Sequence, residues 1–288
     1  MPPQRRRLTV TRRQQLSAIT FLLPAVAVLA VLLIAPLVRL VRMSVHGSAF
    51  TLSEYRTLVT DPTYLRVFWT TFQLALIVTA LCLLIGYPVA YAVAHASPRM
   101  RRWMLLPLLV GLTLSILART YAWVVILQRH GLVNSMLMSL GLTSSPLTLV
   151  YNRFGVYVGM VHILLPFMVM VLLPSMRAID PTLTTAAQSL GARPASAFRL
   201  VYLPLSMPGV IAASTLVLVM ALGFFITPAV LGGGHTTTIA MVVQTQVQEL
   251  LDWSLAAAMG VTLLALSLVA LLIYDRFSNV ERVIGASR

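Results

Sequence analysis

Six long apolar runs dominate this chain and restrict the folds that it can adopt. They cover roughly residues 17–40, 67–94, 103–127, 154–176, 207–231 and 254–274. Crossing about 30 Å of hydrocarbon takes about 20 helical residues, so each run is long enough for one transmembrane helix. Of the 288 residues, 59% are apolar and 10% are charged, which is more apolar surface than a soluble core of this size can bury. The sequence predicts an all-α membrane protein with six transmembrane helices.

The basic residues predict how these helices are oriented. All 21 are Arg. Five lie in the N-terminal tail, and three each lie in the 95–102 loop, the 177–199 loop and the C-terminal stretch. The positive-inside rule places these segments, and both termini, in the cytoplasm. The first run is too long for a cleaved signal peptide and predicts a retained anchor.

We therefore expect three regions along the chain. Residues 1–16 form a basic cytoplasmic tail, residues 17–276 form one six-span transmembrane domain, and residues 277–288 form a second cytoplasmic tail. The net charge of +14 is best explained by this topology and by anionic lipid headgroups. We expect the partner of this charge to be the lipid bilayer and not nucleic acid.

The composition argues against catalysis by this chain. It has no Lys, so it cannot form a phosphate-binding P-loop or a Schiff base. The single cysteine, Cys82, cannot form an intrachain disulfide and is expected to be a small buried hydrophobe. The five histidines are scattered and no hydrolase or metalloprotease motif occurs. We expect no enzyme activity, no cofactor and no metal site.

A polar segment, residues 177–206, separates the fourth and fifth runs and predicts a helical hairpin. Asp180 is suited to cap a helix that starts at Pro181, and Gly191 is suited to end it. Pro194 is expected to start a second short helix that ends at Pro204. Two interpretations remain open: the small residues at the turn dock into a cleft of another protein, or the hairpin lies flat on the membrane.

The hairpin carries a recognisable motif. "TAAQSLGARPASAFRLVYLP", residues 185–204, resembles the EAA motif of permease subunits in ATP-binding-cassette importers, E-A-A-x3-G-x9-I-x-L-P. The spacing matches throughout. Thr185 stands where Glu is usual, which puts a charged contact with the ATPase in doubt, and Val201 stands for Ile. The resemblance implies that the hairpin docks the ATPase through the following residues: Thr185, Ala186, Ala187, Ser189, Leu190, Gly191, Ala192, Arg193 and Pro204.

The resemblance extends over nearly the whole chain. "HGLVNSML", "VGMVHILLPFMVM" and "ITPAVLGGGHTTTIAMVVQTQV" are similar to the first permease of spermidine/putrescine importers. This implies a type I importer fold in the bacterial cytoplasmic (inner) membrane. It also implies four partners: a second permease, two ATPase subunits and a periplasmic or extracellular substrate-binding protein.

The implied solute is a polyamine, but the residues leave alternatives open. A path for cations usually contains acids, and no carboxylate lies in the centre of any predicted span. A small anion such as an opine or a phosphonate therefore remains possible. A carrier that works without ATP is the rival from another class.

Some side chains within the runs are candidates for the translocation pathway or its gate. Arg119 either lines the pathway, with Tyr121 nearby, or extends to the outer headgroups. His162 is expected to be a buried neutral imidazole, with a role in translocation as the alternative. Phe224 and Phe225 either plug the path or simply pack. The last expectations are that Pro204 and Pro208 mark the entry to the fifth span and that Pro228 kinks its end.

Overall fold

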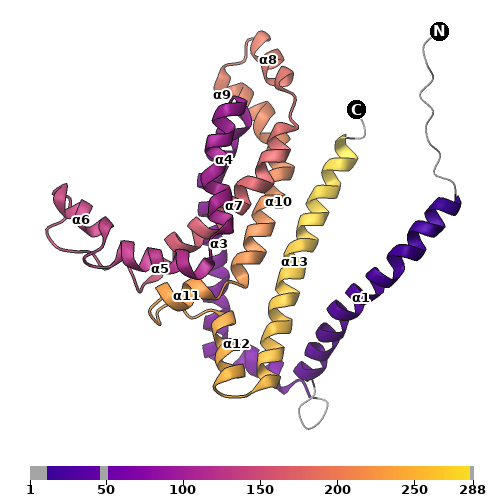
Figure 1. Cartoon of the computed structure of the whole chain (residues 1–288), viewed down its shortest axis with the longest axis vertical. Coiled ribbons are helices and arrows are strands. Elements are labelled where there is room, and N and C mark those ends of the chain that lie inside the picture. The colour runs from indigo at the N-terminus through magenta and orange to yellow at the C-terminus, as the bar shows by residue number, and fades with distance from the viewer. Residues whose placement is uncertain (1–11, 46–50, 286–288) are drawn as a thin grey trace.

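The computed structural model describes residues 12–45 and 51–285, and all regular structure in these ranges is helical (Figure 1). The elements in chain order are α1 (Arg12–Val45), α2 (Ser53–Thr60), α3 (Pro62–His95), α4 (Pro98–Thr113), α5 (Ile116–Leu127), α6 (Leu132–Ser139), α7 (Arg153–Arg177), α8 (Pro181–Ser189), α9 (Pro194–Ala197), the π-helical turn η1 (Phe198–Tyr202), α10 (Leu203–Leu222), α11 (Ile226–Leu231), α12 (Ile239–Gln248) and α13 (Trp253–Gly285). The predicted all-α fold is confirmed. Most of the predicted N-terminal tail, including Arg5, Arg6 and Arg7, lies outside the described residues.

Five helical segments are long and apolar enough to cross a membrane, and a bent pair makes a sixth if it is counted as one span. Four of the five agree with the predicted spans: α1, α3, α7 and α13. The fifth is the continuous segment Pro194–Leu222, which joins α9, η1 and α10.

The third predicted span, 103–127, is wrong as a single helix. Helix α4 ends at Thr113, and α5 starts at Ile116 after two extended residues. The segments Pro98–Thr113 and Ile116–Ser139 differ in direction by 105°. The bend does not fall at Arg119, the charged residue of this run, because Arg119 lies inside α5. The bend instead brings α5 against α7 and α11, and no local pattern in the sequence records those contacts.

The end of the fifth predicted span, 207–231, also needs correction. Helix α10 ends at Leu222, and α11 is a separate short helix beyond Gly223–Phe225. Pro228 lies inside α11, so it does not produce this break.

Pro204 does not end a helix, contrary to expectation. It lies in the first turn of α10, directly after η1, and the helix continues through it. Proline lacks an N–H and clashes with the carbonyl four residues earlier. In η1 the Leu203 N–H bonds to the carbonyl of Phe198, five residues back. This wider turn accommodates the proline ring, so α9, η1 and α10 form one continuous helical segment.

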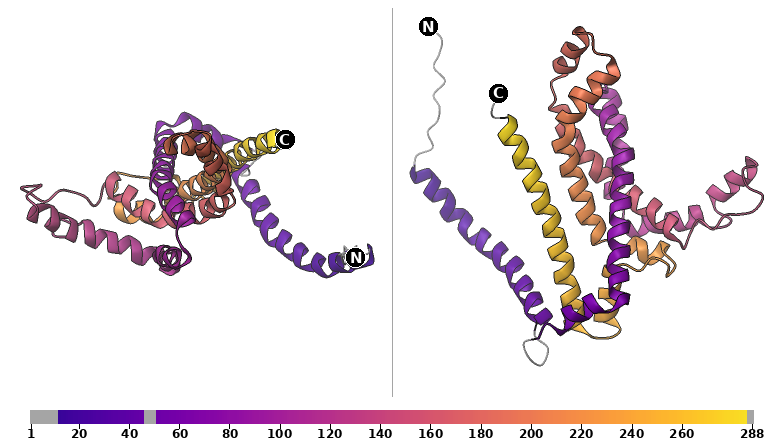
Figure 2. Two further views of the ribbon diagram at one scale, coloured as in Figure 1. Left: turned by 90° about the horizontal axis from the view of Figure 1, so that it is seen from above. Right: turned by 180° about the vertical axis from the view of Figure 1, so that it is seen from behind.

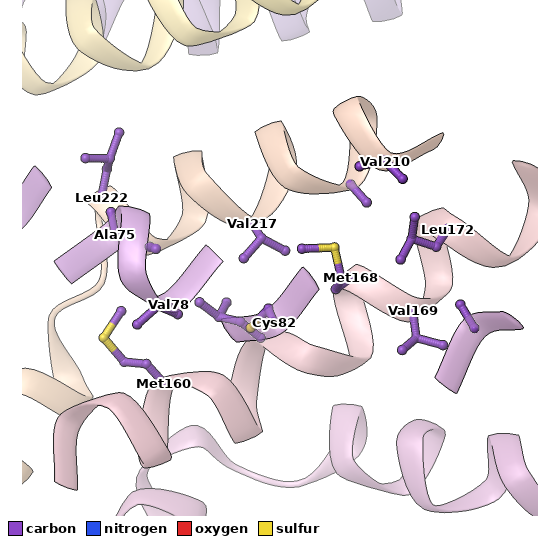
Figure 3. Packing of buried hydrophobic residues seen from close by; sticks show 14 of the residues in the cluster. Ala75, Val78, Cys82, Met160, Met168, Val169, Leu172, Val210, Val217 and Leu222 are labelled. Atoms are coloured by element: carbon purple, nitrogen blue, oxygen red, sulfur yellow. The ribbon is translucent and has the colours of Figure 1, made fainter. Parts of the chain in front are cut away.

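The core lies where α3, α7 and α10 pack together (Figure 3). Val78 and Cys82 from α3, Met160 and Met168 from α7, and Val217 from α10 are completely buried there. Cys82 is thus a buried small hydrophobe, as predicted, and its thiol lies 3.8 Å from the carbonyl oxygen of Val161.

Glycines allow these helices to approach closely. A Cβ atom at Gly209 of α10 would lie 2.4 Å from Cβ of Ser175 on α7. One at Gly86 of α3 would lie 2.8 Å from Cγ of Met168. Small residues at such crossings are what holds helices together in a bilayer, where burial of apolar surface gives little driving force.

Helix α1 leans away from this core (Figures 1 and 2). It meets the rest of the chain near its C-terminal end, where Ser254 Oγ donates to the Met43 carbonyl at 3.2 Å and Tyr55 donates to Ser44 Oγ at 2.8 Å. Its leucines from Leu29 to Leu33 are exposed. Much of its apolar surface is therefore left for lipid or for another protein.

We expect Gly209→Ala to destabilise the fold, because the added methyl group overlaps Ser175 in a helix crossing that cannot widen without separating α7 from α10. Overpacking of this kind costs about 1–3 kcal/mol. The measurement is the thermal unfolding midpoint of the purified protein in detergent. Gly111→Ala is the matched control, since a Cβ there meets no atom within 4 Å. Equal midpoints for the two variants would contradict the close crossing.

Candidate functional site

The segment between α7 and α10 forms the predicted hairpin, and its first helix is capped as the sequence indicated. The Asp180 carboxylate accepts the N–H of Thr182 at 2.9 Å, and Pro181 occupies the first helical turn. This hydrogen bond lowers the pKa of Asp180. A lowered carboxyl pKa means that the cap stabilises α8 at neutral pH and is lost as the pH falls through that pKa.

The other end of α8 closes with a Schellman motif. Gly191 has a φ of +94°, a conformation that favours glycine. Its N–H bonds to the carbonyl of Gln188 at 2.9 Å, and the Ala192 N–H bonds to the carbonyl of Ala187 at 3.0 Å. The predicted stop at Gly191 is confirmed. Because the backbone is hydrogen-bonded at both ends, this short helix has a defined conformation.

The hairpin is exposed in this chain. Helix α8 buries no residue, and Leu190 at its C-terminal end is 89% exposed. Around it Ala186, Ser189 and Arg193 are exposed, and Ala187 and Ala192 are half-buried. Thr185 is uncharged, and its hydroxyl donates to the Pro181 carbonyl at 3.1 Å within α8. The hairpin projects beyond the helical core (Figure 1), and its tip is an apolar knob.

Aromatic rings fasten the base of the hairpin to α3. Phe198 meets Tyr91 edge-on at 5.6 Å between ring centroids, and Tyr202 meets Tyr91 at 5.0 Å. His95 lies 5.4 Å from Tyr202, and Tyr87 lies 6.3 Å from Phe198. We call these five residues the aromatic cluster. Edge-to-face pairs of this kind contribute about 0.5–1.5 kcal/mol each beyond their burial.

A hydrogen bond extends this attachment into the core. The hydroxyls of Tyr87 and Ser206 lie 2.9 Å apart, joining α3 to the first turn of α10. A displacement of the hairpin therefore acts on α3 and α10 together. The sequence interpretation missed these residues, although a signal existed. Tyr87, Tyr91 and His95 recur every four residues, and so do Phe198 and Tyr202, which places each set on one helical face.

A second site forms where the two broken helices meet. The hydroxyls of Thr120 on α5 and Thr227 on α11 lie 3.3 Å apart, and both residues are fully buried. Breaks in membrane helices persist only where protein or a water-filled cavity covers the unpaired backbone, and such breaks often border transport pathways. This places α5, α11 and the Gly223–Phe225 break among the candidates for a gate.

Arg119, the residue before Thr120 on α5, is buried in the protein and does not extend towards headgroups. It is only 7% exposed, and its Nε and Nη1 atoms have no hydrogen-bond partner among the described residues. Tyr121 is 57% exposed. Tyr121 therefore does not share the buried environment of Arg119.

His162 is exposed, so the prediction of a buried imidazole is wrong. The next residues of α7, Ile163 and Leu164, occupy the face that is buried in the protein. His162 instead points towards α5, where Trp123 meets it edge-on at 5.6 Å. Phe224 packs against the core and Phe225 is half-buried at the start of α11. Among the residues that the structure describes, no group of His, Cys, Asp and Glu could hold a metal ion.

Comparison with known proteins identifies the family of this chain. Residues 83–280 match the family of binding-protein-dependent transport system inner membrane components. The chain belongs to this family. The matched range runs from the middle of α3 into α13, so it includes both candidate sites and the parts of the core that α7 and α10 contribute. The family is one of transport permeases.

Individual relatives agree with this assignment. The permease is 36% identical over 230 residues to the spermidine/putrescine transport system permease protein PotB of Escherichia coli, covering 80% of this chain and 83% of that protein. Its fold is similar to a bacterial ABC transporter involved in the import of the acidic polysaccharide alginate, with a TM-score of 0.72, 20% identity and coverage of 94% and 96%. A bacterial alginate ABC transporter in complex with an alginate pentasaccharide-bound periplasmic protein gives a TM-score of 0.69 at 20% identity, with coverage of 93% and 95%.

We expect Phe198→Ala to loosen the hairpin without unfolding the permease, because it removes ring contacts to Tyr87, Tyr91 and Tyr202. Hydrogen exchange should become faster in α8, α9 and η1 and remain unchanged in the buried part of α7. Phe154→Ala, which truncates an exposed ring on α7, is the control. If Phe198→Ala leaves exchange in the hairpin unaltered, the aromatic cluster does not hold it.

Proposed function

We propose that this permease imports polyamines, spermidine or putrescine, as one half of a transmembrane pathway driven by external ATPase subunits. The observation that carries the proposal is the identity to a spermidine/putrescine permease over most of both chains. The proposed complex contains a second permease, two ATPase subunits and a substrate-binding protein. The family description and the alginate transporter captured with its periplasmic protein support this composition.

The hairpin is proposed to be the coupling helix. The chain has no Lys for a phosphate-binding loop, so ATP-driven movement must reach it from another protein. The knob at Leu190 is apolar and almost fully exposed, as a surface awaiting a partner would be. Ala186, Ala187 and Ala192 keep its relief low, so a cleft on an ATPase can close around it.

The substitution of Thr185 for the motif's Glu changes the character of this contact. Because the Thr185 hydroxyl is used within α8, docking in this permease depends on the apolar knob and on the exposed Arg193. The aromatic cluster then passes the movement to α3 and α10. Two-state rocking of packed helices is a common response to such a local contact.

The arginines indicate the direction of transport. The hairpin and the α3–α4 turn lie at one end of the molecule, and α2 and α12 lie at the other (Figure 1). Arg99, Arg101 and Arg102 sit in the first of these regions, together with Arg193 and Arg199 of the hairpin. The positive-inside rule supports a cytoplasmic position for this end. The ATPase subunits would then bind from inside and the binding protein from outside.

The pathway is proposed to run past the two broken helices. Arg119, Tyr121, His162, Phe224 and Phe225 remain its candidate residues, with Phe224 and Phe225 at the break itself. Helix α1 is proposed to pack on lipid and on the second permease, which would cover its exposed leucines. The tails at 1–16 and 277–288 are proposed to be cytoplasmic.

Leu190→Glu should abolish assembly with the ATPase, because it places a charge in an apolar socket. Truncation of a central contact residue costs about 2 kcal/mol or more, so binding should weaken by more than about tenfold. The measurement is co-purification of the ATPase in detergent, where no membrane is present. Leu140→Glu is the matched control, since Leu140 is the equivalent C-cap of α6 and is 68% exposed. Normal co-purification of Leu190→Glu would favour a hairpin that lies on the membrane.

The substrate can be tested in proteoliposomes that contain the complete complex. Spermidine or putrescine, delivered by the binding protein, should stimulate ATP hydrolysis and accumulate inside. An opine or a phosphonate should neither accumulate nor compete. Stimulation by one of these anions alone would replace the polyamine assignment. Uptake driven by an ion gradient after removal of the ATPase would reject ATP-driven transport altogether.

A further inference from the structure

Two cavities that share His235 are lined by basic side chains. The first, of about 430 Å³, lies between the starts of α3 and α7 and the loop before α12, and its lining includes Arg66, Arg153 and His235. The second, of about 620 Å³, contains Arg129 and His130 in addition to His235. All five side chains are exposed. We call these five residues the basic cleft.

The cleft carries one sign of charge. In the part of the chain that the structure describes, no carboxylate lines either cavity. Asp61, five residues before Arg66, is used as the cap of α3, where it accepts the N–H of Thr63 at 2.7 Å. A cleft lined by charges of one sign focuses its field and attracts groups of the opposite sign. The basic cleft is therefore suited to anions.

The backbone beneath the cleft is held in place. Gly233, in the loop between α11 and α12, has a φ of +54°, and a Cβ atom there would lie 2.6 Å from Cβ of Tyr151. This loop thus lies directly on the segment before α7. On its other side the Ile239 N–H donates to Thr71 Oγ1 at 2.9 Å, which attaches the start of α12 to α3. A ligand of the cleft would meet a surface that is already formed, which favours binding.

The cleft lies on the opposite side of the membrane from the hairpin. Helices α3 and α7 both start at the cleft and end next to the α3–α4 turn and the hairpin. At 1.5 Å per residue they are roughly 50 Å and 37 Å long, enough to cross the bilayer. The cytoplasmic position proposed for the hairpin puts the cleft outside. The positive-inside rule disfavours arginines there, so three around one cleft indicate a specific role.

The nature of the cleft favours an acidic protein as its ligand. A polyamine is a cation and would be repelled. A lipid would present its acyl chains to the long apolar faces of the spans, whereas each residue that lines the two cavities lies in a loop or within the first three turns of a helix. The remaining anions at this surface are carboxylates of a soluble protein.

We propose that the basic cleft binds acidic side chains of the substrate-binding protein and so holds that protein on the outer face of the permease. The inference rests on the proposed function for the identity of this partner. The guanidinium groups of Arg66 and Arg153 pair with carboxylates in one cavity, and Arg129 pairs with another in the second. His235, between them, supplies a further N–H donor. Charge pairs of this kind set the association rate and the specificity of a complex.

The first test uses the complete complex in nanodiscs and measures the concentration of binding protein that half-saturates the stimulation of ATP hydrolysis. The double variant Arg66→Glu, Arg153→Glu should raise this concentration about tenfold or more, because like charges then face each other. Arg56→Glu is the matched control, since Arg56 is an exposed arginine on α2 at the same end and lines neither cavity. An unchanged concentration for the double variant would overturn the proposal.

Arg66→Gln and Arg153→Gln, tested singly, remove one exposed charge each and carry the test if the double variant does not assemble. Each should raise the half-saturating concentration in the same direction by a smaller factor, and no change in either would likewise reject the cleft. Added salt should weaken binding to the wild-type complex more than binding to either variant, because it screens the attraction. Equal salt dependence would contradict the charge pairs.

The second test identifies the acids. Exposed Asp and Glu residues of the binding protein are changed to Lys one at a time. At least one change should weaken binding to the wild-type complex and restore binding to a permease that carries Arg66→Glu or Arg153→Glu. If no acid gives this rescue, the basic cleft is not the docking site.

The outcomes separate this proposal from the proposed function. The readout is binding of the soluble protein, so a solute other than a polyamine would leave the cleft assignment intact. A wild-type complex that its binding protein does not stimulate would reject the importer proposal and the cleft with it. Normal stimulation, with an unchanged half-saturating concentration in the double variant, rejects the cleft alone. If that variant instead loses anionic lipid that co-purifies with the wild type, the cleft belongs to lipid headgroups.

Discussion

The hydrocarbon interior of the membrane imposes the constraint on which the rest of this structure depends. Every backbone N–H and C=O there must be paired within the protein, so the chain crosses as helices and can interrupt them only where other segments cover the ends. The two interruptions, at Leu114–Ser115 and at Gly223–Phe225, lead into helices that pack on one another through Thr120 and Thr227. This mutual cover concentrates irregular backbone at one place, beside the buried Arg119. The α3–α7–α10 core stays continuous next to it.

Stiffness and exposure are divided between different parts of the permease. The core is close-packed, with glycines at the crossings and completely buried side chains such as Val78 and Met168. The hairpin has the opposite character, since its shape comes from caps at Asp180 and Gly191 and α8 buries nothing. The aromatic cluster joins the two. A small exposed element with a rigid attachment is suited to bind a partner and to transmit that partner's movement to the long helices.

Parts of the chain's apolar surface have no cover within the chain itself. Helix α1 and the outer face of α5 expose apolar side chains. These features have a common explanation if the molecule is half of a pathway and a second permease supplies the rest. The exposed apolar surfaces would provide the area of contact.

Much of this protein was determined by local sequence. The apolar runs predicted all-α membrane architecture, Asp180 and Gly191 predicted the ends of α8, and the EAA spacing indicated the family, because these features depend on hydropathy, caps and neighbours along the chain. The break after Thr113, the end of α10 at Leu222, the exposure of His162 and the burial of Arg119 were decided by packing. So was the partnership of Tyr91 with Phe198 and Tyr202. Each of these depends on which helices meet after folding, and residues more than a hundred positions apart, such as Thr120 and Thr227, leave no periodic signal of their contact.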